Sequence, residues 1–208
     1  YELVRTRNDG YSGISSYNWK TVGNIGNFIQ SFFWGHALDT KGNSMFTYNM
    51  YCGVIIFALM ICYFSNKNIN IWIKLKRLIL IGIMILSLYV TGFIYIMHGF
   101  AYPHMFANRH GFILIILILN SAFECSCKIK KEGIFRVILN AILVIALLVI
   151  AFLYTDDVQN IACYMVTIML CVYFFICLVL YERNSITHNA LLINVIILCM
   201  VEILTNSI

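Results

Sequence analysis

The feature that most constrains this chain is a series of six long apolar runs separated by short polar connections. Each run has about the length that a helix needs to cross roughly 30 Å of hydrocarbon, and none alternates as a barrel strand does. A membrane-spanning segment must satisfy its backbone hydrogen bonds internally, so the runs predict helices. They cover Tyr48–Phe64, Leu78–Met97, Asn108–Cys125, Ile134–Tyr154, Ile161–Tyr181 and Thr187–Leu204.

Hydrophobic residues make up 62% of the 208 residues, and charged residues only 11%. No soluble core of this size can hide that much apolar surface. We therefore expect an all-α, polytopic transmembrane helix bundle of about six spans in residues 47–208. The chain starts with Tyr1, and we expect it to be a piece of a larger polypeptide. The isolated Cys125 and Cys127 pair favours neither a disulfide framework nor a metal site, and no cofactor is predicted.

Residues 1–46 form the longest polar stretch and also contain an amphipathic pattern. Apolar residues recur there at three- and four-residue steps, which is typical of one helix face. An interfacial helix on the membrane surface fits this pattern, and so does a lid packed over the bundle. The residues on this face are Trp19, Val22, Ile25, Ile29 and Phe32, flanked by Phe28 and Phe33.

The charges of the connections predict the orientation. The first, third and fifth connections carry nine Lys and Arg residues, whereas the second and fourth carry one, Arg109. Because basic residues accumulate on the cytoplasmic side, the odd connections are predicted to lie inside. Residues 1–46, the 97–112 loop and the C-terminus are then extracytoplasmic.

The 97–112 segment is the candidate site. It contains the only proline, Pro103, and three of the five histidines, His98, His104 and His110. Arg109 goes against this charge bias. Its position is equally compatible with a functional role and with a solubilising or packing role. Histidines beside an arginine can bind a phosphate or pyrophosphate, because the guanidinium matches phosphate oxygens. A histidine metal site is a less favoured alternative, since no ligand-like spacing accompanies it.

Polar residues within the runs have mainly structural interpretations. Ser87, Thr91, Tyr95 and His98 share a stripe at helical spacing on the second run, which favours helix–helix hydrogen bonds over a substrate track. Glu202 is a candidate ion-pair partner for Arg109 or His98.

Two further predictions concern the polar residues of the other runs. Glu124 is expected to pair with Lys128 near the inner boundary. Three asparagines, Asn120, Asn140 and Asn194, are expected to join helices. The basic loops are interpreted as topology signals and contacts for anionic lipid, so nucleic-acid binding is not predicted.

The 97–112 segment resembles a block of the YfhO family of bacterial multi-pass membrane proteins. The block has the form H-G-F, then proline, then an arginine followed closely by phenylalanine. Where an aromatic residue and a serine are expected after the arginine, this chain has His110 and Gly111. The residues that carry the resemblance are His98, Gly99, Phe100, Pro103, Phe106, Arg109 and Phe112.

Two shorter marks support the resemblance. Tyr51 and Gly53 are similar to a Y-x-G opening of an earlier helix. Glu202, Leu204 and Asn206 are similar to an E-x-L-x-N ending of a later span.

The resemblance implies a polytopic protein similar to the GT-C glycosyltransferases. Such a protein takes a sugar from a polyprenyl-phosphate donor and places it on a cell-envelope polymer such as teichoic acid. Arg109 would then contact the donor phosphate, with His98 in support, and the catalytic acidic residue would lie outside this sequence. A transporter or flippase for a lipid-linked envelope precursor and a non-catalytic membrane scaffold are the alternatives.

Overall fold

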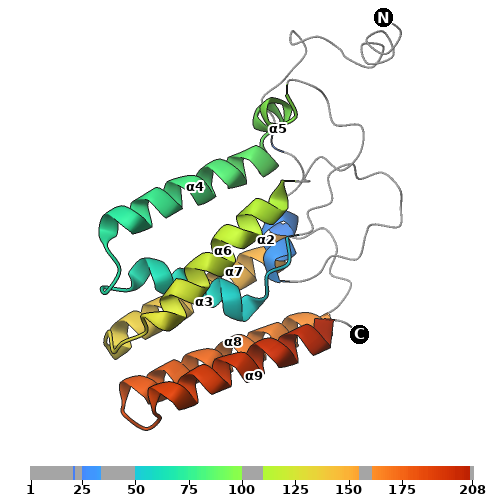
Figure 1. Cartoon of the computed structure of the whole chain (residues 1–208). Coiled ribbons are helices and arrows are strands. Elements are labelled where there is room, and N and C mark those ends of the chain that lie inside the picture. The colour runs from blue at the N-terminus through green and yellow to red at the C-terminus, as the bar shows by residue number, and fades with distance from the viewer. Residues whose placement is uncertain (1–20, 22–24, 34–49, 100–109, 155–160, 207–208) are drawn as a thin grey trace, which may run out of the picture.

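A computed structural model describes residues 21, 25–33, 50–99, 110–154 and 161–206 of the chain. Within these residues every regular element is an α-helix, which confirms the all-α prediction. The helices form a bundle in which successive long helices run in opposite directions (Figure 1). They are α2 (Ile25–Phe33), α3 (Val54–Ser65), α4 (Ile71–Tyr89), α5 (Thr91–Met97), α6 (Gly111–Cys127), α7 (Ile134–Tyr154), α8 (Ile161–Glu182) and α9 (His188–Asn206).

The connections of the bundle separate by charge. The turns at 66–70, 128–133 and 183–187 all lie at one end, which we call the basic end (Figure 1). The short helices α2 and α5, the start of α6 and the end of α9 lie at the opposite end, which we call the loop end. The described helix ends that flank the even connections thus lie at the end of the bundle opposite the odd connections.

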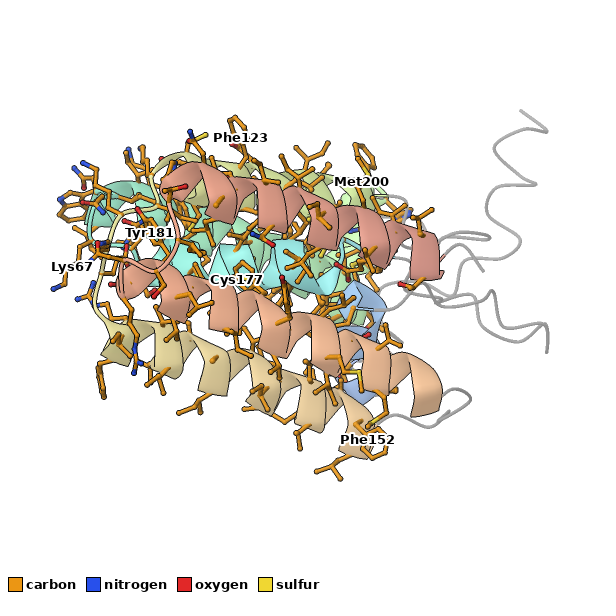
Figure 2. The ribbon with its side chains drawn as sticks, turned by 90° about the horizontal axis from the view of Figure 1, so that it is seen from below. Lys67, Phe123, Phe152, Cys177, Tyr181 and Met200 are labelled. Atoms are coloured by element: carbon orange, nitrogen blue, oxygen red, sulfur yellow. The ribbon has the colours of Figure 1, made fainter. Side chains whose placement is uncertain are left out.

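Three helices, α7, α8 and α9, are long and apolar enough to cross a membrane, and α3 and α6 are shorter apolar helices. Large apolar side chains cover the outer surface of the bundle: Phe123 is 69% exposed and Met200 59% exposed, and both point away from the other helices (Figure 2). In water such a surface would be strongly unfavourable, whereas in lipid it is the expected one. The chain is a membrane protein with a helical bundle.

The helix predicted over Leu78–Met97 differs in the structure. It starts earlier, at Ile71, because the side chain of Asn70 caps it by accepting the Trp72 N–H at 2.9 Å. It also breaks at Val90, whose φ of −113° and ψ of 123° are extended. Val90 pairs with Thr21 in an antiparallel bridge, which requires that extended backbone. The predicted stripe from Ser87 to His98 is therefore not one continuous helix face, and the Ser87 hydroxyl donates to Met84 O of its own helix.

Helix α2 packs on the bundle at the loop end. Phe28, Phe32 and Phe33 are all at most 4% exposed. The ring of Phe28 lies 5.2 Å from that of Tyr89 on α4, and the ring of Phe33 lies 4.8 Å from that of Phe57 on α3. This is the packing that the lid alternative predicts; Trp19 and Val22, from the same predicted face, lie outside the described residues.

Helix α3 lies at the centre and contacts α2, α6, α7, α8 and α9. Its apolar residues face neighbours on all sides, so Val54, Ile55, Ala58 and Tyr63 are completely buried. A helix that is apolar all round is expected at such a position. Both ends of α3 are consequently enclosed by other elements, and their unpaired backbone groups need partners from those elements.

Candidate functional site

The two ends of the 97–112 loop meet at the loop end of the bundle. His98 follows α5 and His110 precedes α6, and their rings lie 5.9 Å apart between centroids in an edge-on arrangement. His98 is held by its Nδ1, which lies 2.8 Å from Ile94 O, and His110 by its Nε2, which lies 3.1 Å from Ser87 O. The structure thus brings together two of the predicted site residues.

The hydrogen bonds define which ring nitrogens carry protons. A carbonyl oxygen only accepts, so His98 donates from Nδ1 and His110 donates from Nε2. In the neutral state each ring keeps a lone pair on its other nitrogen. Burial lowers the pKa of His110, the hydrogen bond to Ser87 O opposes this shift, and the charge of His98 lowers the pKa further. An anion bound beside the pair would favour the doubly protonated rings, which can donate to it.

Glu202, the third predicted site residue within the described part of the chain, has a different environment. It is 3% exposed and its carboxylate reaches the N-terminal end of α3. The backbone N–H of Val54 donates to Oε1, the N–H of Ile55 donates to Oε2 at 3.3 Å, and the Tyr51 side chain also hydrogen-bonds to the carboxylate. Glu202 therefore caps α3, with its negative charge at the positive end of the helix dipole.

Gly53 makes this cap possible. Its φ of 89° is in a region that residues with a side chain rarely adopt. A Cβ atom placed there would lie 3.0 Å from Oε2 of Glu202 and 3.2 Å from its Cδ. The two outlying sequence marks, Tyr51 with Gly53 and Glu202, therefore form one contact in the folded chain.

Helices α8 and α9 form a hairpin. Glu202 joins this hairpin to the bundle at the loop end, and a second carboxylate joins it at the basic end. Glu182, the last residue of α8, accepts the N–H of Glu132 at 2.7 Å and the N–H of Gly133 at 3.2 Å, just before α7 starts. The α8–α9 hairpin thus carries a carboxylate at each end of the bundle, and each binds backbone donors at the start of another helix.

The end of α3 at the basic end is also closed by polar side chains. Lys74 is buried, and its ammonium group donates to Phe64 O at 2.9 Å and to Asn66 O. These carbonyls lie in the last turn of α3 and just beyond it, where a cation is favoured by the helix dipole. Asn66, which is 2% exposed, donates in turn to Lys128 O at 3.2 Å.

The predicted ion pair of Glu124 is confirmed, and the structure adds a second cation. The carboxylate of Glu124 lies 2.8 Å from Lys128 Nζ and 2.9 Å from an Arg77 nitrogen. The Arg77 guanidinium also lies over the ring of Tyr63, 4.9 Å from its centroid. The N-terminal turns of α4 are therefore joined to the C-terminal turn of α6.

A cavity of about 40 Å³ lies at the basic end. Its lining includes the carboxylates of Glu132 and Glu182 as well as Arg136. Burial raises the pKa of Glu132, and the Arg136 charge opposes that shift. Pockets for small molecules usually have volumes of about 300 Å³ or more, so this cavity does not accommodate a sugar or a lipid headgroup.

The asparagines within the helices have different roles. Asn140 donates to Ser65 Oγ at 2.7 Å and joins α7 to α3, and Asn194 accepts from the Tyr173 hydroxyl at 3.3 Å and joins α9 to α8. Both confirm the predicted helix–helix contacts. Asn120 instead lies on the exposed face of α6, so within the described residues that prediction is wrong for Asn120.

Two of the predicted site residues, Arg109 and His104, lie outside the described residues, as does any contact that Arg109 makes with Glu202. Sequence reasoning missed the cap on α3 and the roles of Glu182 and Lys74. The two short marks, Y-x-G and E-x-L-x-N, contain the residues of the cap, and a glycine at the start of a helix can indicate a positive φ, but neither mark predicted the contact between them. For Glu182 and Lys74 no pattern distinguished them from the other charges at helix ends.

Comparison with known proteins gives one result for the whole chain. The family model described as bacterial membrane protein YfhO matches residues 3–208. No curated protein and no solved structure matches the chain.

Proposed function

The chain belongs to the YfhO family of bacterial membrane proteins, and on this premise we propose that it forms part of a membrane glycosyltransferase-like protein. The proposed reaction takes a sugar from a polyprenyl-phosphate donor and places it on a cell-envelope polymer such as teichoic acid. In this proposal the 97–112 loop binds the phosphate of the donor. The catalytic acidic residue belongs to a part of the protein outside this sequence.

The observation that supports the proposal is the meeting of His98 and His110 at the mouth of the loop. Their rings lie 5.9 Å apart, and Arg109 directly precedes His110 in the sequence. A guanidinium, together with imidazole rings that are protonated at their second nitrogen when the anion binds, supplies hydrogen-bond donors for phosphate oxygens. Because each ring already donates one N–H to a backbone carbonyl, its orientation is fixed before the ligand binds.

The charge distribution supports an outward-facing site. The nine Lys and Arg residues of the three odd connections belong to the basic end, opposite the loop end that carries His98 and His110 (Figure 1). Basic residues favour the cytoplasmic side, so we place the loop end outside the cell. Residues 1–46 are extracytoplasmic in the same proposal, and the envelope polymer would reach the site from that side.

The transporter alternative has less support. Ser87 and Ser121 are buried hydroxyl residues within α4 and α6, and each donates to a carbonyl of its own helix. Their donors are satisfied locally and do not form a polar path along the bundle. No observation favours a flippase or a scaffold over the proposed transfer.

The experiment uses the full-length protein in bacterial membranes and measures sugar transfer from a polyprenyl-phosphate donor. We expect Arg109→Ala to reduce the transfer rate by about 100-fold, as the loss of one charge-stabilising donor commonly does. Arg183→Ala, which removes an exposed arginine at the basic end, is the control and should keep wild-type activity. Full activity of a correctly inserted Arg109→Ala protein would remove this residue from the mechanism.

A further inference from the structure

The two histidines of the loop end depend on the break between α4 and α5. Val90 stands at this break. Its N–H still donates to Leu86 O at 3.0 Å, and its carbonyl accepts the N–H of Phe93 at 3.0 Å. Its ψ of 123° replaces the value of about −42° that a helix requires, so the next peptide group is turned away from α4. Helix α5 therefore leaves the line of α4 (Figure 1).

The break frees the carbonyl that holds His110. In a continuous helix Ser87 O would accept the N–H of Thr91, four residues later. The turned peptide group after Val90 removes that donor, and Ser87 O accepts instead from Nε2 of His110 at 3.1 Å. The orientation of the His110 ring thus depends on the extended backbone of Val90.

The same break places His98. Helix α5 begins at Thr91, directly after Val90, and His98 follows the last residue of this short helix. Nδ1 of His98 lies 2.8 Å from Ile94 O of α5, so the direction of α5 decides where the ring lies. A continuous helix through α4 and α5 would move His98 and release His110. The separation of 5.9 Å between their ring centroids is therefore a consequence of the break.

Thr21 and helix α2 hold the break from two sides. The backbone of Thr21 pairs with Val90 in an antiparallel bridge. The Phe28 ring of α2 lies 5.2 Å from the ring of Tyr89, the residue before the break. Phe28 is 4% exposed, so α2 is itself fixed in the bundle. The extended backbone is thus maintained by a segment about 70 residues earlier in the chain, as only tertiary contacts can do.

We propose that Thr21 and Val90 are positioning residues of the donor site: their pairing keeps α4 and α5 apart and holds His98 and His110 at the separation at which both rings reach one phosphate group. This inference rests on the proposed function and assigns the geometry of its site to residues outside the 97–112 loop. Neither positioning residue touches the phosphate. Loss of the pairing therefore weakens donor binding more than it slows the chemical step.

The first test measures the geometry and needs no enzyme activity. His98→Cys and His110→Cys are introduced together into the full-length protein in native membranes, and a short bifunctional thiol reagent links them. Mass spectrometry of the linked peptides gives the rate. We expect Val90→Ala, which replaces a β-branched residue by the best helix former, to reduce this rate by about three- to tenfold. Val90→Ile keeps the β-branched side chain and should leave the rate unchanged. Equal rates in the two variants would overturn the proposal.

The second test measures sugar transfer from the polyprenyl-phosphate donor. Val90→Ala should raise KM for the donor by about three- to tenfold and change kcat by less than about twofold, and Val90→Ile should restore the wild-type KM. In a protein that carries both His98→Gln and His110→Gln, Val90→Ala should raise KM no further, because the two groups it positions are gone. An equal increase in that background would assign Val90 a general structural role and overturn the proposal.

The two tests also separate this inference from the proposed function. If the proposed function is wrong, Arg109→Ala keeps full activity, while the linkage rate still reports whether the break sets the histidine separation. If only the present inference is wrong, Arg109→Ala loses activity and Val90→Ala behaves like Val90→Ile in both measurements.

Discussion

Glu202 and Gly53 form a close contact across most of the length of the chain: a Cβ atom on Gly53 would lie 3.0 Å from Oε2 of the Glu202 carboxylate. The contact allows Glu202 to bind the first backbone N–H groups of α3. It joins the last helix to the central one. At the other end of α3, the buried ammonium group of Lys74 binds the last carbonyls of the same helix.

Gly53→Ala should destabilise the protein by about 1 to 3 kcal/mol, because it forces a side chain into a positive φ and toward the carboxylate. The measurement is the free energy of unfolding in mixed micelles. Gly82→Ala is the matched control, since nothing lies within 4 Å of a Cβ at that helical position. The control should be neutral or stabilise the helix by about 0.5 to 1 kcal/mol. Equal effects of the two substitutions would contradict the proposed strain.

Glu202→Ala should destabilise the protein by about 1 to 3 kcal/mol, because it leaves the buried N–H groups of Val54 and Ile55 without their acceptor. Glu202→Gln keeps one carbonyl oxygen and should recover part of this loss. The same unfolding measurement applies. If Glu202→Ala unfolds like the wild type but loses donor binding, the residue belongs to the substrate site and not to the cap on α3.

Lys74→Met should destabilise the protein by about 1 to 3 kcal/mol, because the carbonyls of Phe64 and Asn66 lose a buried charged donor. Methionine keeps much of the apolar stem, so the change isolates the ammonium group. Lys76→Met, two residues later on the exposed face of α4, is the control and should change the stability by less than about 0.5 kcal/mol. A loss of stability in both variants would indicate a general effect of basic residues at this end.

Acidification should weaken the fold through His110. Burial lowers the pKa of this residue below its ordinary value of 6.5, so the unfolded chain binds a proton more readily than the folded chain. The stabilising contribution is complete above pH 6.5 and decreases as the pH falls below that value. We expect the unfolding temperature to fall between pH 7.5 and 5.5 in the wild type and to fall less in His110→Gln. An identical fall in both proteins would assign the pH dependence to other groups.

The local predictions from the sequence succeeded where the interacting groups are close along the chain. Glu124 and Lys128 are one helical turn apart, and their ion pair follows from that spacing. The amphipathic pattern around Phe28 predicted a helix where α2 lies, although Ile25 of the predicted apolar face is exposed and the polar residues Gln30 and Ser31 are buried. The apolar runs and the distribution of Lys and Arg established the class of protein and the two ends of the bundle.

What the sequence by itself determined is therefore a helical membrane protein, its apolar segments and its basic connections, because each of these depends on composition and spacing within a short window. The tertiary structure alone decided which face of each apolar helix is covered. It turned Asn140 and Asn194 inward and Asn120 outward, and it brought Glu202 to Val54, 148 residues away. It also broke the predicted helix at Val90 by pairing that residue with Thr21. The physical reason is that a helix apolar on all sides carries no periodic signal for its partners, so only packing with distant segments selects them.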